Sequence, residues 1–175
     1  MLWLIDAFEA VRDFMGLGGP VLLAIAFTIF VMWALIVERL VFFRTGMKAM
    51  SRDIYEQWET RPERRSWNAE QIRELMISRF SLETNKGISM IQTLVALCPL
   101  FGLLGTVTGM IKVFEVMAVS GSGNVRAMAA GVSQATVPTM AGMVGALSGV
   151  LLVTILSRRA AREVQFLEDS LTMDH

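Results

Sequence analysis

The sequence predicts an all-α membrane protein with three transmembrane helices and cytoplasmic helical extensions. Hydrophobic residues make up 54% of its 175 residues and charged residues only 18%, whereas soluble proteins have about 45–50% and about 25%. Three uncharged apolar runs are each close to the ~20 residues that cross a bilayer. They cover residues 20–37, 88–111 and 135–156. Charge-free runs of this length favour membrane spans over buried core helices.

The remaining composition argues against several classes of function. The 16 Lys and Arg residues balance the 16 Asp and Glu residues, so no basic field indicates binding to nucleic acid. Cys98 is the only cysteine and His175 the only histidine, which leaves little material for a zinc or haem site or a Cys/His nucleophile. The spans also contain no Asp pair and no Ser/His pair. We therefore expect no metal, no cofactor and no enzymatic activity.

The distribution of basic residues predicts the orientation. Ten of the 16 Lys and Arg residues lie between residues 38 and 87, three lie after residue 157, and only Arg12 precedes the first run. By the positive-inside rule, the N-terminus is periplasmic and the C-terminus cytoplasmic. The expected segments are a periplasmic amphipathic helix (1–17), transmembrane helix 1 (18–43), a cytoplasmic helical segment (44–86), transmembrane helix 2 (87–114), a periplasmic loop (115–134), transmembrane helix 3 (135–157) and a cytoplasmic tail (158–175).

The first segment has the periodicity of a helix with one apolar face. Apolar residues at positions 4, 5, 8, 11 and 15 lie opposite Asp6, Glu9 and Asp13. Such a helix either lies on the outer membrane surface or packs against a partner subunit. Its acidic residues and the absence of a basic start do not fit a cleavable signal peptide.

The cytoplasmic segment is expected to form two helices. The first continues from the first span towards Thr60 and ends at Arg61-Pro62, because proline disfavours a helical residue before it. Asn68 and Gln71 fit a capping box for the second helix, which we expect to run straight into the second span. A segment of this size with so many charges is too small to form a core of its own.

The second and third spans share the spacing G-x-x-G-x-x-x-G. Its members are Gly102, Gly105 and Gly109 in the second span and Gly142, Gly145 and Gly149 in the third. Small residues at this spacing let helix backbones approach closely within a membrane. We therefore expect these spans to form an inner, tightly packed layer, with the first span facing lipid. Two inner helices cannot enclose a pore, so we expect a homo-oligomer with Gly105 and Gly145 at subunit contacts.

No Asp, Glu, Lys, Arg or His lies within the three apolar runs, although a pump that relays protons through its own acids needs such a group. The polar residues are hydroxyls instead. Thr106 and Thr139 lie at similar depth, about 8 and 10 Å from the span midpoints, and are candidate pore-lining residues that could supply hydrogen-bond donors. Thr93 and Thr154, each about 12 Å towards the cytoplasm, are a possible second polar level. In the alternative interpretation, each threonine only bonds to a backbone carbonyl of its own helix.

Residues 98–111 (CPLFGLLGTVTGMI), followed by Phe114, resemble the second-span motif of the ExbB/TolQ/MotA proton-channel family. The resemblance implies a homopentamer around transmembrane helices of an ExbD- or TolR-like single-span protein, which supplies an intramembrane aspartate. Thr106 matches the family's pore threonine and Thr139 its third-span threonine. The chain departs from the pattern at Gln134, where many relatives have glutamate, and at Ser148-Gly149, where they tend to have proline. Its cytoplasmic tail is also short.

The resemblance implies a multi-pass subunit of the bacterial inner membrane. It is most similar to a short ExbB, which would couple the proton motive force to a TonB-type protein for outer-membrane transport. A TolQ-like subunit of the Tol-Pal envelope system remains open, because the membrane motif is shared. A passive oligomeric scaffold for partner helices also remains open. A MotA-type stator fits less well, because those subunits have four spans and a large cytoplasmic domain.

Overall fold

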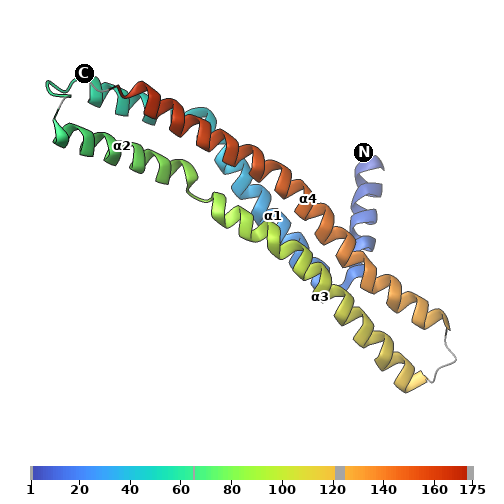
Figure 1. Ribbon diagram of the computed structural model, residues 1–175. Coiled ribbons are helices and arrows are strands. Elements are labelled where there is room, and N and C mark those ends of the chain that lie inside the picture. The colour runs from blue at the N-terminus through green and yellow to red at the C-terminus, as the bar shows by residue number, and fades with distance from the viewer. Residues whose placement is uncertain (1, 65, 121–124, 173–175) are drawn as a thin grey trace. The chain divides into compact units, whose positions relative to one another are not determined.

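The computed structural model describes the backbone of residues 2–64, 66–120 and 125–172, and most side chains from Gly19 onward. Four helices form this part of the chain: α1 (Leu2–Glu59), α2 (Trp67–Asn85), α3 (Ile88–Ser120) and α4 (Val125–Ser170) (Figure 1). Three helical stretches, Gly19–Glu59, Trp67–Val119 and Val125–Ser170, are long and apolar enough to cross a membrane. The all-α fold with three candidate spans is therefore confirmed, while the orientation stays a prediction.

Helix α1 is broken at Gly19. This residue has φ 64° and ψ −162°, a backbone conformation that is essentially limited to glycine. Pro20 restarts the helix, because its missing N–H and fixed φ suit a first helical position. The break lies next to the expected boundary between residues 1–17 and 18–43. Most side chains before Gly19, on which the predicted amphipathic face depends, lie outside the described residues.

The structure corrects two predictions about α2. Its N-cap is Ser66, whose side chain accepts a hydrogen bond from the Ala69 N–H at 3.3 Å, and not Asn68. Both residue types are good N-caps, and local sequence alone does not choose between them. The expected continuous helix into the second span is interrupted at Gly87, which has φ 78°. The Gly87 carbonyl then accepts the Ile91 N–H at 3.0 Å and opens α3.

Most of the expected loop over residues 115–134 is helical. Helix α3 continues to Ser120 and α4 begins at Val125. Alanine and methionine, which have high helix propensity, are frequent on both sides of the connection. The two helices also stay in contact there, because a Cβ at Gly131 would collide with the side chain of Val113. The expected tail is helical as well, since α4 continues to Ser170.

The chain forms two compact units, each built from parts of several helices. The first unit comprises residues 1–33 and 93–150. Its buried side chains come from α1, α3 and α4 and include Leu22, Ile25, Met32, Val95, Cys98 and Ala135. The opposite face of this part of α1 is exposed at Leu23, Phe27 and Phe30. Helix α1 therefore packs on one face and leaves an apolar face open, which suits the outer helix of a transmembrane bundle.

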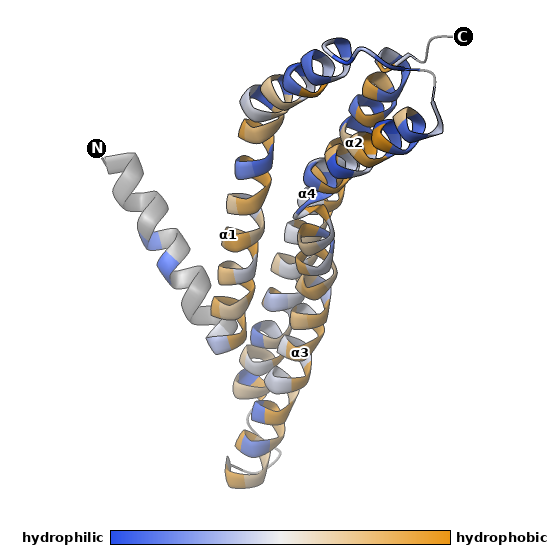
Figure 2. Ribbon diagram, turned by 90° about the vertical axis from the view of Figure 1, so that its left-hand side faces the viewer, coloured by the Kyte–Doolittle hydropathy of each residue, from blue (hydrophilic) through white to orange (hydrophobic). Residues whose placement is uncertain are grey.

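The second unit comprises residues 34–92 and 151–175. Its largest fully buried side chains are those of Trp58, Phe80, Ile36, Ile91, Leu156, Leu167 and Leu171. Blue, hydrophilic residues are frequent on α2 and on the last part of α4 (Figure 2). Hydrophilic surface residues around buried apolar side chains are typical of amphipathic helices that pack against one another.

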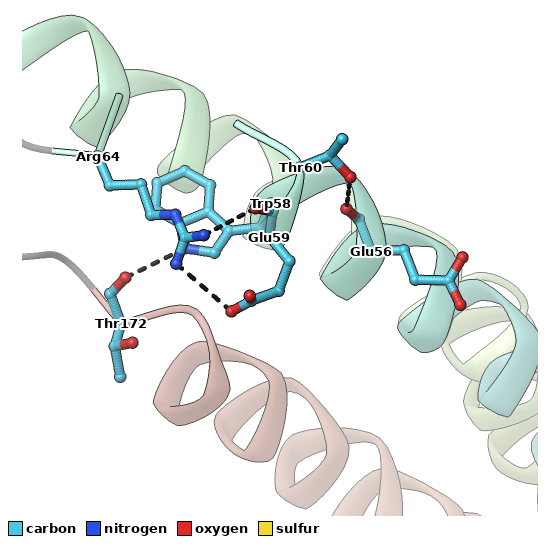
Figure 3. Close-up of polar contacts among 6 residues, drawn as sticks. All are labelled: Glu56, Trp58, Glu59, Thr60, Arg64 and Thr172. Atoms are coloured by element: carbon cyan, nitrogen blue, oxygen red, sulfur yellow. Dashed lines mark hydrogen bonds and ion pairs between the residues drawn. The ribbon is translucent and has the colours of Figure 1, made fainter. Parts of the chain in front are cut away.

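Side chains from α1 and α2 hold the end of α4 within the second unit. The Trp58 Nε1–H donates to the Thr172 carbonyl at 3.1 Å (Figure 3). Arg73 donates from Nε to the Leu171 carbonyl at 2.6 Å and from its Nη2 to the Glu168 carbonyl at 2.7 Å. The Glu168 carbonyl is one of the last four of α4, which have no partner within the helix, so its bond to Arg73 caps α4. The other two bonds hold Leu171 and Thr172, which directly follow the helix. Arg64 similarly caps α1 by donating to the Glu59 carbonyl at 2.7 Å (Figure 3).

Candidate functional site

The site lies where α3 and α4 pack in the first unit. The two backbones nearly touch there, because a Cβ at Gly102 would lie 3.0 Å from the Thr139 Cα. A Cβ at Gly142 would lie 2.5 Å from the Cys98 carbonyl oxygen. Neither position has room for a side chain, so the glycines allow the close contact.

The other glycines of the repeated spacing also contact neighbouring helices of the same chain. A Cβ at Gly109 would lie 2.5 Å from the Ala135 Cβ, one at Gly149 would lie 2.6 Å from the Met32 sulfur, and one at Gly105 would meet the ring of Pro138. A Cβ at Gly145 would meet the side chain of Ile29.

Gly105 and Gly145 are therefore buried within the subunit, and their expected place at subunit contacts is wrong. The physical reason is that antiparallel α3 and α4 turn their own small-residue stripes towards each other. The small residues thus allow close backbone contact between helices of the same chain, without a second copy.

Thr139 makes a hydrogen bond between the two helices. Its hydroxyl donates to the Gly102 carbonyl oxygen at 3.0 Å and is partly buried. In a regular α-helix that carbonyl also accepts the N–H of the residue four positions later, which here is Thr106. The bond therefore joins the third-span threonine to the backbone turn that carries the second-span threonine.

Thr106 has a different local role. Its hydroxyl donates to the Leu103 carbonyl of its own helix at 2.7 Å. Along the axis of α3, Thr106 lies one turn, about 6 Å of rise, from Gly102, whose carbonyl accepts the Thr139 hydroxyl. Both hydroxyl protons are thus engaged with backbone carbonyls, while each hydroxyl oxygen keeps lone pairs that can accept a hydrogen bond.

Thr93 and Thr154 belong to different compact units. Thr93 lies in the first unit and Thr154 in the second. Both side chains are exposed, and both residues have an interaction partner. The second polar level stays a prediction.

Lys112 and Gln134 form a polar cluster that the sequence pattern did not predict. A Cβ built on Gly19 would lie 3.7 Å from both the Lys112 Nζ and the Gln134 Nε2. The two residues also line an open pocket of about 570 Å³ together with Glu115. On α4, Gln134 lies about 140° around the helix from Thr139, so these two polar side chains face different sides. Lys112 is the first charge after the second apolar run, which is the signal that could have located this cluster.

Exposed apolar side chains flank the two threonines. On α3 they include Leu103, Val107 and Met110, and on α4 they include Met140, Met143 and Val144. In a membrane, such surfaces are covered by lipid or by neighbouring helices. Within the described part of the chain, no group of three or more His, Cys, Asp or Glu residues is placed to hold a metal ion.

Two relatives from Synechocystis sp. are similar to part of this chain. One, described as biopolymer transport protein ExbB-like 1, is 33% identical over 84 residues, which cover 46% of this chain and 33% of the relative. The other, described as biopolymer transport protein ExbB-like 3, is 28% identical over 83 residues, which cover 46% of this chain and 40% of the relative. The matched stretches thus span well under two thirds of these relatives.

A longer match covers most of the helical chain. Residues 36–169 match the MotA/TolQ/ExbB proton channel family. This range includes all of α2 and α3 and nearly all of α4, and hence the glycine contacts and both threonines. The chain therefore belongs to the MotA/TolQ/ExbB proton channel family.

Proposed function

We propose that this chain is the channel-forming subunit of a proton-driven complex in the bacterial inner membrane. In this complex an ExbD-like single-span partner supplies the titrating aspartate, and the proton motive force drives a TonB-type protein for outer-membrane transport. Membership of a proton channel family supports the role as a channel-forming subunit. The relatives described as ExbB-like biopolymer transport proteins support the transport role.

The proposed orientation has a periplasmic N-terminus and cytoplasmic ends of α1 and α4. It rests on the ten basic residues between positions 38 and 87. In this orientation the pair Thr106 and Thr139 lies in the outer half of the membrane, and residues 44–86 and 158–175 are cytoplasmic. Lys112 and Gln134 then mark the periplasmic end of the channel wall.

The observation that carries the proposal is the hydrogen bond from Thr139 to Gly102 beside Thr106 in acid-free spans. With both hydroxyl protons engaged, the hydroxyl oxygens accept hydrogen bonds from water or from a protonated carboxyl group. Such bonds favour the neutral form of the partner's acid. A hydroxyl that rotates away from its carbonyl instead donates to the ionised form, at a net cost of about 1 kcal/mol.

We propose a homopentamer, in which the exposed apolar faces of α3 and α4 contact partner helices, neighbouring subunits or lipid. The number five rests on the family resemblance. The intrachain packing of the glycines supports a rigid α3–α4 hairpin as the repeating wall element. A ring of such hairpins would place one Thr139 and one Thr106 per subunit around the central helices.

Proton flux into vesicles tests this function. The chain is reconstituted with its co-purifying single-span protein, and flux is followed with an enclosed pH-sensitive dye under an imposed pH gradient. We expect flux that requires the partner and is abolished by Asp→Asn in its span. Binding of the partner without flux would identify a passive scaffold instead. Co-purification of a TonB-like protein supports ExbB-like transport, whereas association with Tol-Pal components would support the TolQ-like alternative.

A further inference from the structure

A basic pocket lies between α1 and α4 in the second unit. Its volume is about 670 Å³. From α1 it is lined by Phe43, Arg44, Met47 and Lys48, whose spacing places them along one face of the helix. Phe43 and Met47 are buried, with 6% and 3% of their surface exposed, so the floor of the pocket is apolar.

Helix α4 supplies the other wall. Its lining residues are Arg159, Arg162, Glu163 and Phe166, which also follow helical spacing along one face. Phe166 is exposed over 70% of its surface. The pocket therefore joins an apolar floor to a charged rim, as amphiphilic ligands require.

The rim carries excess positive charge. Arg44, Lys48, Arg159 and Arg162 face one carboxylate, that of Glu163. Within the described ranges, none of these four cations takes part in an ion pair, and Arg162 only donates to the Arg158 carbonyl at 3.4 Å. Arginine outside the pocket does find acidic partners, as Arg52 does with Glu56 at 3.4 Å. The pocket thus has a net charge that an anion would balance.

In the proposed membrane orientation, the pocket lies at the depth of lipid headgroups. Residues 43 and 157 are the expected last residues of the first and third spans. At 1.5 Å per residue, Arg159 lies about 3 Å and Arg162 about 8 Å beyond the third span. The headgroup layer extends about 5–8 Å beyond the hydrocarbon on each side. A phosphate in that layer is within reach of the rim, while its acyl chains remain in the hydrocarbon.

We propose that this pocket binds the headgroup of an anionic phospholipid. Arg44 and Arg159 hold the phosphate, because a guanidinium offers paired donors that match phosphate oxygens. Phe43 and Met47 pack against the glycerol and the first methylene groups. Basic pockets between helices on the cytoplasmic side suit such headgroups. The inference rests on the membrane placement in the proposed function. The apolar floor and the adjacent spans favour a lipid over a soluble phosphate.

Native mass spectrometry of the purified full-length oligomer tests the proposal. Dioleoyl phosphatidylglycerol or dioleoyl phosphatidylcholine is added to the detergent-solubilised protein. We expect the wild-type oligomer to bind the phosphatidylglycerol at least tenfold more tightly than the phosphatidylcholine. Arg44→Gln/Arg159→Gln should lose that preference. The matched control Arg52→Gln/Arg158→Gln removes the same charge from the same helices outside the pocket and should change the affinity by less than twofold.

An equal loss of phosphatidylglycerol preference in both double variants would overturn the proposed pocket site. The lipid would then be attracted only by the general positive charge of the surface. Competition is measured on the wild-type oligomer. Displacement of the lipid by glycerol phosphate would support a headgroup site. Stoichiometric binding of inorganic phosphate with no lipid preference would make it a soluble-phosphate site. Binding by dissociated subunits but not by the oligomer would show that a second copy covers the pocket. Absent proton flux with retained lipid preference would overturn the proposed function alone.

Discussion

The Thr139 hydroxyl on α4 donates a hydrogen bond to the Gly102 carbonyl oxygen on α3 at 3.0 Å. The same pair is in close backbone contact, since a Cβ at Gly102 would lie 3.0 Å from the Thr139 Cα. The glycine thus brings the carbonyl within reach of the hydroxyl. Packing and polar chemistry are coupled at this point, so a change in either residue affects both.

Thr139→Val should weaken the α3–α4 contact, because it removes the interhelical donor while keeping the side-chain shape. Such bonds within membranes contribute about 0.6 kcal/mol and at most about 1.7 kcal/mol. We expect a lower thermal unfolding midpoint in detergent and reduced partner-dependent proton flux. Thr139→Ser keeps the donor and should retain most of both. Wild-type unfolding and flux in Thr139→Val would contradict this role.

Thr106→Val tests the pathway with less effect on packing, because the Thr106 hydroxyl bonds only to the Leu103 carbonyl of its own helix. We expect an unchanged oligomer and unchanged partner binding but reduced proton flux. The Thr106→Val/Thr139→Val variant should conduct least, and Thr106→Ser should conduct nearly as wild type. A double valine variant that is fully assembled and conducts normally would identify both residues as packing threonines.

Gly142→Ala should destabilise the subunit itself. Its new Cβ would lie 2.5 Å from the Cys98 carbonyl oxygen, and overpacking of this kind costs about 1–3 kcal/mol. Gly46→Ala is the matched control, since the Cβ there would meet the ring of Phe42, which can shift. Thermal unfolding of both variants should show a clearly lower midpoint than wild type for Gly142→Ala only. Equal midpoints would argue against the tight α3–α4 contact.

Arg73→Gln should loosen the end of α4, because it removes the charged donor to the Leu171 and Glu168 carbonyls. We expect faster amide hydrogen exchange over residues 167–172, corresponding to a loss of about 1–2 kcal/mol of local stability. The control is Arg79→Gln, an exposed arginine on the same helix. Unaltered exchange in Arg73→Gln would show that Trp58 alone holds this end.

Features that depend on local sequence are predictable in this molecule, whereas those that depend on contacts between distant segments are not. Long charge-free runs predict three candidate spans, because crossing a bilayer imposes a length on the local sequence. The choice of Ser66 over Asn68 as N-cap depends on more than residue type, since both types cap helices. The α3–α4 register, which sets Thr139 opposite Gly102, depends on contacts between distant segments. The same holds for the approach of Lys112 and Gln134 to Gly19.

The break at Gly19 also determines how changes in chain length propagate. A continuous helix transmits rotation, since one inserted residue turns everything beyond it by about 100°. A break with non-helical backbone angles interrupts that transmission. An insertion before Gly19 therefore leaves the rotational phase of the following helix unchanged. An insertion after Ile25 would turn Leu22 and Ile25 by about 100° relative to the rest of the span. The length of the first segment can thus vary independently of the span's helical phase.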